Sequence, residues 1–198
     1  MRELIESLDN QKIFKINEGK TYLANTLTDH TPSTSPLVLK QAINAIMRKI
    51  GNKLEKANKI IGEEERGGYI AACLSLEANL PFCLTKQNPC KIPGEIGVEF
   101  PMIYNNNMTM YLNGLSTNDK VLIVDDIIDS GGTMIAIINA LQKMNIEIVK
   151  AIALVERVEK QGIRRIKEVT GIDVETIIKI DTSGEKSVVI NKHELLSL

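Results

Sequence analysis

One segment, Val121–Met134, constrains this chain more than any other. Four apolar residues run directly into Asp125 and Asp126, and a turn of small residues, 129–133, then leads into a helical pattern. A continuous apolar run is typical of a parallel strand that is buried on both faces. Open α/β sheets bind ligands at the carboxyl ends of such strands, and small residues before a helix let backbone N–H groups approach an anion. The segment therefore predicts a site for a phosphorylated sugar with several hydroxyls.

Outside this segment, strand-like and helix-like patterns alternate along the chain. A helix after Pro36 is predicted by Ser35 as its N-cap, by apolar residues at helical spacing and by Gly51 at its end. The later helices are expected at Arg66–Ala78, Thr133–Met144 and Ile163–Thr170. The strands are expected at Lys59–Gly62, Pro81–Leu84, Val121–Asp125, Ile146–Val155, Val174–Ile180 and Val188–Ile190. This alternation predicts an α/β fold with a doubly wound, mostly parallel sheet.

The chain length of 198 residues predicts a single domain, residues 1–198. Residues 1–34 and 174–198 break the alternation, and we expect them to form a small hood over the carboxyl edge of the sheet. Residues 86–118 show no clear period and contain several Pro, Gly and Asn residues. A long irregular stretch inside a compact domain is usually a functional lid or a mobile loop, and we expect one there.

Composition argues against several classes of function. A net charge of −1 gives no reason to expect nucleic-acid binding, and no apolar run approaches a membrane span. The N-terminus lacks the apolar region of a secretory signal. The three cysteines form no Cys-x-x-Cys pair, and His30 and His193 stand apart, which argues against a zinc site. We expect a soluble, cytoplasmic protein that binds neither nucleic acid nor membrane.

Three segments together resemble the type I phosphoribosyltransferases, enzymes that use phosphoribosyl pyrophosphate (PRPP). Val121–Met134 resembles their PRPP-binding signature, which is an apolar strand, two acidic residues and a small-residue loop with Gly and Thr. Gly62–Gly68 resembles the pyrophosphate loop of adenine phosphoribosyltransferases, where an acidic residue and Arg-Gly recur. Lys91–Glu95 resembles the Leu-Pro-Gly region of the family's mobile catalytic loop.

The chain as a whole most resembles the archaeal hypoxanthine/guanine phosphoribosyltransferase group, over roughly residues 37–190. Met110–Leu115, Met134–Leu141 and Ile177–Asp181 carry that resemblance. It implies a purine-salvage enzyme that moves the 5-phosphoribosyl group from PRPP to a purine base, giving a nucleoside monophosphate and pyrophosphate. It also implies Mg²⁺ as cofactor and a homodimer.

The resemblance implies a role for each residue of these segments. Asp125 and Asp126 would hold the ribose 2- and 3-hydroxyls, directly or through Mg²⁺. The 5-phosphate would be held by Asp129, Ser130, Gly131, Gly132 and Thr133, and the pyrophosphate by Glu64, Glu65, Arg66, Gly67 and Lys86. The stretch around residues 86–95, with Lys91 as a cation, would close over the reacting centre. Asp129 would also handle the proton at N7 of the purine, as a general acid or base.

Several alternatives stay open at this point. Arg66-Gly67 is typical of adenine enzymes, whereas Asp129 is typical of enzymes acting on 6-oxopurines, and the overall resemblance favours hypoxanthine and guanine. Many family members have an Arg-Lys pair where this chain has Lys86-Gln87, so a non-catalytic sensor of PRPP or nucleotides is a second hypothesis. Arg157 follows a strand and either lines the base pocket or lies on the surface.

Overall fold

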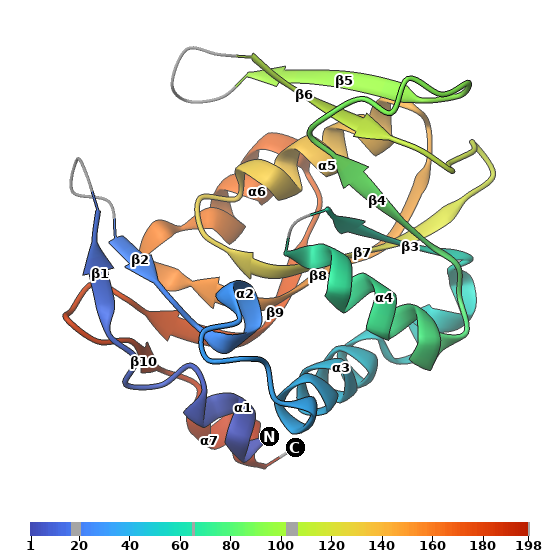
Figure 1. Cartoon of the computed structure of the whole chain (residues 1–198). Coiled ribbons are helices and arrows are strands. Elements are labelled where there is room, and N and C mark those ends of the chain that lie inside the picture. The colour runs from blue at the N-terminus through green and yellow to red at the C-terminus, as the bar shows by residue number, and fades with distance from the viewer. Residues whose placement is uncertain (17–20, 65, 102–106, 198) are drawn as a thin grey trace.

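A central sheet of eight strands organises the chain (Figure 1). The computed structural model describes residues 1–16, 21–64, 66–101 and 107–197. The strand order is β10-β9-β8-β7-β3-β4-β6-β5, and the five strands from β9 to β4 run parallel to one another. These five are β3 (Lys59–Glu63), β4 (Phe82–Lys86), β7 (Lys120–Ile128), β8 (Glu147–Arg157) and β9 (Val174–Asp181).

Helices cover both faces of the sheet, which confirms the doubly wound α/β prediction. Figure 1 shows α3 and α4 on one side and α5 and α6 on the other. Alternate residues of β7 explain this arrangement, because Leu122 and Val124 pack in one apolar cluster with α3 and α4, whereas Val121 and Ile123 pack in a second with α5 and α6. The four helices are α3 (Pro36–Ile50), α4 (Gly67–Ala78), α5 (Gly132–Lys143) and α6 (Gly162–Thr170).

Strand β7 is longer than the sequence pattern predicts. It continues to Ile128, so Asp125 and Asp126 lie within the strand and Asp125 pairs with Ala153 of β8. On its other side, β7 pairs with β3 only through residues 121–123. The two carboxylates therefore lie just beyond the end of that pairing, where the turn after β3 can approach them.

Residues 86–118 contain regular structure, so the expectation of an irregular stretch was wrong there. β5 (Ile96–Pro101) and β6 (Asn107–Leu112) form an antiparallel pair, and β6 pairs antiparallel with β4. Val98, Met110 and Leu112 are buried in the core. β5 contains Gly97 and Pro101, which weaken its period, and β6 is only six residues long, so the pattern did not reveal these strands.

The two chain ends meet beside the sheet, where Figure 1 shows the blue and red segments side by side. Backbone hydrogen bonds join Asn10 N to Ser187 O and Ser187 N to Gln11 O, each at 2.8 Å. The segments comprise α1 (Arg2–Glu6), β1 (Ile13–Lys15), β2 (Thr21–Leu23) and α2 (Thr26–Asp29) at one end, and β10 (Val188–Val189) and α7 (Lys192–Leu196) at the other. We call these two chain ends the hood: residues 1–16 and 21–29, and the residues after Asp181, whose strand β10 is the edge strand of the central sheet next to β9.

Two short 3₁₀ helices complete the described structure, η2 (Gly51–Lys56) after α3 and η3 (Val158–Lys160) after β8. Within the described ranges, none of the helices has the length and apolar character needed to cross a membrane.

Candidate functional site

The paired carboxylates of β7 are buried and incompletely hydrogen-bonded. Asp125 and Asp126 are each 4% exposed, and Asp125 Oδ1 accepts a 2.9 Å hydrogen bond from Asp126 N. Asp126 Oδ2 is buried and has no hydrogen-bond partner among the described residues. A buried acceptor without a partner is costly and needs an explanation, and a bound ligand supplies one here.

Burial also changes the acidity of the pair. Burial and the neighbouring Asp126 raise the pKa of Asp125 well above its usual value. Burial raises the pKa of Asp126 to about 6, although the hydrogen bond with Asp125 and the charge of Arg66 act in the opposite direction. Carboxylates with raised pKa values at a sheet edge are typical of functional sites.

The two carboxylates could supply one or two ligands to a magnesium ion. Mg²⁺ commonly takes one or two carboxylates together with phosphate oxygens and water. The partnerless Asp126 Oδ2 offers one such ligand. Across the described residues, no cluster of three or more His, Cys, Asp or Glu side chains could hold a metal by itself.

The loop predicted to hold the 5-phosphate connects β7 to the N-terminus of α5. Gly131 is the N-cap of this helix of 12 residues and has φ +80°, a conformation that favours glycine. Ser130 and Thr133 are exposed on either side of it, so the loop is open to a ligand. Free backbone N–H groups at a helix N-terminus attract phosphate.

The first residue of α6, Gly162, holds this loop in place, and the sequence pattern missed it. A Cβ atom at Gly162 would lie 2.2 Å from Asp129 O, and one at Gly131 would lie 2.9 Å from Gly162 O. The two backbones therefore meet where only glycine fits. The expected helix began at Ile163, and a contact between segments so far apart leaves no local signal.

The turn after β3 approaches the carboxylates through a third glycine. A Cβ atom at Gly67 would lie 3.1 Å from Asp125 Oδ1 and 3.3 Å from Val124 O. Arg66 N donates a 3.2 Å hydrogen bond to Glu63 Oε2, and Glu65 lies outside the described residues. The structure thus brings Arg66 and Gly67 to the carboxylate pair.

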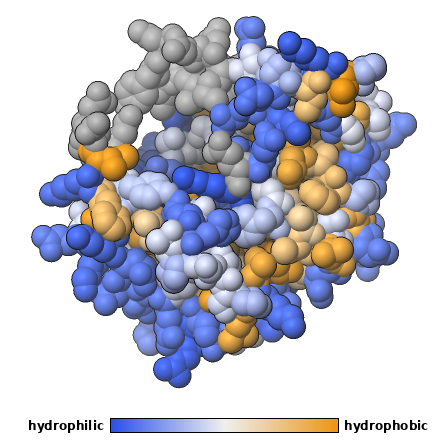
Figure 2. Space-filling view, in the orientation of Figure 1, coloured by the Kyte–Doolittle hydropathy of each residue, from blue (hydrophilic) through white to orange (hydrophobic). Residues whose placement is uncertain are grey.

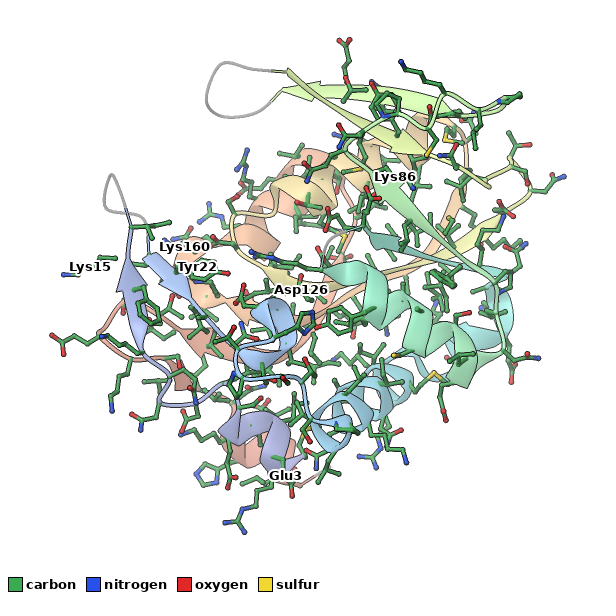
Figure 3. The ribbon with its side chains drawn as sticks, in the orientation of Figure 1. Glu3, Lys15, Tyr22, Lys86, Asp126 and Lys160 are labelled. Carbon is green, nitrogen blue, oxygen red and sulfur yellow. The ribbon has the colours of Figure 1, made fainter. Side chains whose placement is uncertain are left out.

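The hood reaches the same turn through contacts that the sequence did not indicate. Arg66 Nη2 lies 3.3 Å from the hydroxyl of Tyr22 and 3.7 Å from Asp29 Oδ1, and its guanidinium lies 5.9 Å from the centre of the Tyr22 ring. Tyr22 also donates a hydrogen bond to Asp29. In the view of Figure 3, Tyr22 lies on the hood side of Asp126, with Lys86 on the side of β5 and β6.

The two predicted lysines are placed differently. Lys86 ends β4, and its Nζ lies 3.6 Å from Glu64 Oε1, so these two predicted pyrophosphate ligands are neighbours. Lys91 is exposed in the turn before β5, with φ +57°, and its N–H donates to Glu95 Oε2 at 2.8 Å. That contact joins Lys91 to its own turn and does not bring it to the carboxylates.

Arg157 at the end of β8 is buried, so the surface alternative was wrong. Its side chain is 6% exposed, and Nη1 lies 3.4 Å from Asp129 Oδ2. The same guanidinium donates to Thr182 Oγ1 and to Thr21 Oγ1 of the hood, at 2.8 and 2.7 Å. Arg157 therefore contacts both the predicted phosphate loop and the hood.

The sequence matches a known protein family and has relatives of similar length. The phosphoribosyl transferase domain model matches residues 36–185. The hypoxanthine/guanine phosphoribosyltransferase of Methanothermus fervidus is 32% identical over 193 residues, 97% of this chain and 99% of that protein. The hypoxanthine/guanine phosphoribosyltransferase of Methanocaldococcus jannaschii is 36% identical over 187 residues, 94% of this chain and 99% of that protein.

Solved structures share the fold at lower identity. The adenine phosphoribosyltransferase of Thermoanaerobacter pseudethanolicus superposes with a TM-score of 0.74 at 20% identity, covering 90% of this chain and 99% of that chain. The adenine phosphoribosyltransferase of Giardia lamblia in complex with 9-deazaadenine superposes with a TM-score of 0.69 at 20% identity, covering 85% of this chain and 92% of that chain. At these identities the likeness concerns the fold.

Proposed function

This chain belongs to the phosphoribosyltransferase family, and on that premise we propose that it transfers the 5-phosphoribosyl group from PRPP to a purine base and releases pyrophosphate. The observation that carries the proposal is the buried Asp125–Asp126 pair, joined by β7 to the glycine loop at the N-terminus of α5. Asp126 Oδ2 has no hydrogen-bond partner in the part of the chain that the structure describes. A diol-binding acid pair and a phosphate-binding helix terminus match the two ends of a phosphoribosyl group.

Each part of the site would perform one task. Asp125 and Asp126 would hold the ribose hydroxyls and a Mg²⁺ ion, which would supply positive charge to stabilise the leaving pyrophosphate. The backbone of 129–133 and the hydroxyls of Ser130 and Thr133 would hold the 5-phosphate, and the turn 64–67 with Lys86 would hold the pyrophosphate. The displacement at C1 passes through an oxocarbenium-like state in which negative charge develops on the leaving pyrophosphate. Nearby cations stabilise that charge and so lower the barrier.

Two further roles belong to the same proposal. Asp129, half exposed beside the base side of the loop, would exchange the proton at purine N7. Residues 86–118, which contain β5 and β6, would close as a mobile catalytic loop, bring Lys91 towards the pyrophosphate and exclude water.

Hypoxanthine and guanine are the bases we favour, because the curated relatives that match nearly the whole chain carry that name. With PRPP and Mg²⁺ present, we expect both bases to be converted to their monophosphates with kcat/KM at least about tenfold above adenine, a difference of about 1.4 kcal/mol in transition-state binding. Pyrophosphate release with hypoxanthine, guanine, xanthine and adenine measures this. A preference for adenine would reverse the base assignment, and no turnover with any base would reject the proposal.

The second candidate, a non-catalytic PRPP or nucleotide sensor, has one observation in its favour. Gln87 removes a cation that many family members have, and the remaining Lys86 lies 3.6 Å from Glu64, which offsets its charge. A sensor would bind PRPP with Mg²⁺ in calorimetry and release no pyrophosphate with any base. Turnover with one base of the panel decides against it.

We also propose a cytoplasmic homodimer. The three cysteines are free thiols, as suits a reducing compartment. Figure 2 shows apolar side chains gathered over α4 and β4, where Leu76 is 86% exposed and Phe82 42% exposed. Exposed apolar residues gathered in this way suit an interface with a second copy.

Leu76→Glu is expected to convert the dimer to a monomer, because it places a charge on this apolar surface. Sedimentation velocity of both proteins at micromolar concentration measures the change. Val169→Glu is the matched control, because Val169 is 56% exposed on α6, away from α4. A wild-type monomer, or a dimer that survives Leu76→Glu, would contradict this interface.

A further inference from the structure

Two arginines connect hood strand β2 to the rest of the site. Tyr22 contacts Arg66 of the turn after β3, and Thr21, the neighbouring residue of β2, contacts Arg157 of β8. Arg66 belongs to the proposed pyrophosphate side. Arg157 has no assigned role, although it is buried and charged.

Arg157 meets the hood with the fork geometry of a guanidinium. Nη1 donates to the backbone carbonyl of Thr21 at 3.3 Å, and Nη2 donates to its hydroxyl at 2.7 Å. Nε donates to Thr182 Oγ1 at 2.8 Å and lies 3.3 Å from Glu159 Oε1. A planar guanidinium offers five donors in fixed directions, so it can order several acceptors at once.

The remaining partner of Arg157 is the side chain of Asp129, at 3.4 Å from Nη1. The backbone of the Asp129 loop has a separate support, because Gly131 and Gly162 hold it against the start of α6. Arg157 therefore orients the carboxylate of Asp129 without fixing the loop's amides. The Asp129 carboxylate and the backbone amides of the same loop are thus positioned by different contacts.

We propose that Arg157 is a positioning residue that ties hood strand β2 to the carboxylate of Asp129 and so assembles the base side of the site. The expected effect of Arg157 on catalysis rests on the proposed function. Its expected effect on the position of β2 rests on the contacts alone. Arg157 would act through Thr21 and Asp129, and PRPP would be bound without its help.

Arg157→Gln tests the catalytic consequence. With PRPP saturating, kcat/KM for the preferred base is expected to fall by roughly 10- to 100-fold, as for a misplaced catalytic group, while the Kd of PRPP with Mg²⁺ stays within about twofold. Arg157→Lys keeps the charge but loses the fork, so it should recover only part of the loss. Arg164→Gln is the matched control, since Arg164 is an exposed arginine of α6 paired with Glu168, and it should change neither quantity.

Limited trypsin digestion of the ligand-free protein tests the tie without any assay of catalysis. Lys15 is exposed at the end of β1, in the strand paired with β2. Cleavage after Lys15 is expected to accelerate at least about threefold in Arg157→Gln and in Thr21→Val, with thermal midpoints measured alongside. Thr21→Val keeps the buried charge and removes only the hydroxyl, so it carries the test if Arg157→Gln fails to fold.

The two experiments distinguish the contact with β2, the positioning role in catalysis and the proposed function. Unchanged cleavage after Lys15 in both Thr21→Val and Arg157→Gln would overturn the proposed link between Arg157 and β2. Faster cleavage with unchanged kcat/KM would overturn the positioning role, and a PRPP Kd that rises as much as the base KM would show a general disturbance of the site instead. If no base is turned over by the wild type, the proposed function fails, whereas the digestion result still decides whether Arg157 holds the hood.

Discussion

Asp126→Asn is expected to lower kcat/KM for PRPP by on the order of 10²- to 10³-fold and, at the same time, to stabilise the ligand-free protein at pH 8. The catalytic loss follows from removing a charged oxygen that has no hydrogen-bond partner among the described residues and is available to the ribose or its metal ion. The gain in stability follows from the cost of keeping that charge buried.

The pH dependence of this gain follows from the direction of the pKa shift. Burial raises the pKa of Asp126 to about 6, above the value of about 3.9 for an unfolded chain. A raised carboxyl pKa gives stability that is complete below pH ~4 and is lost as the pH rises through ~6. The Asn variant has no such loss, so its advantage should reach at most about 2–3 kcal/mol at pH 8 and vanish near pH 4.

A matched substitution at the other end of β7 should behave in the opposite way. Asp119 precedes β7 and accepts a 2.7 Å hydrogen bond from Lys59. Burial acts to raise the pKa of Asp119, but the hydrogen bonds from Lys59 and Ser116 and the charge of Lys59 together outweigh burial, so the pKa is lowered. Asp119→Asn should therefore reduce stability at neutral pH and leave PRPP turnover unchanged. Thermal melts from pH 4 to 8 and PRPP titrations compare the two; an Asp126→Asn protein with wild-type PRPP affinity would remove Asp126 from the site.

The sequence was most informative where function and fold use the same local pattern. The apolar run of β7, its two carboxylates and the following glycines are contiguous, so the strand, the helix start and the candidate site could all be predicted from them. β5 and β6 could not, because their order depends on pairing with β4 across a distance in the chain. The role of Gly162 could not be predicted either, because it depends on a contact with the Asp129 loop, which is distant in the sequence. The burial of Arg157 likewise depends on Thr21 of the hood.

Gly162→Ala is expected to have the second large effect, because it moves the proposed phosphate loop directly. Its Cβ would lie 2.2 Å from Asp129 O and 2.7 Å from Ile128 Cγ2, and a backbone oxygen cannot give way as a flexible side chain does. Relief requires a shift of about 1 Å between α6 and the loop, enough to cost on the order of 10²-fold in PRPP affinity. Overpacking of this kind should also cost about 1–3 kcal/mol of stability.

Gly171→Ala, at the other end of α6, separates the effect of the contact from the effect of losing a glycine. Gly171 has φ +73° with no atom within 4 Å of its would-be Cβ, so alanine there meets backbone strain of about 1–2 kcal/mol and no clash. The two variants should therefore lose comparable stability, yet only Gly162→Ala should lose PRPP affinity in calorimetry with Mg²⁺. Equal losses of affinity would mean that α6 supports the loop through its overall stability. Loss confined to Gly162→Ala would mean that the glycine contact itself sets the position of the phosphate-binding backbone.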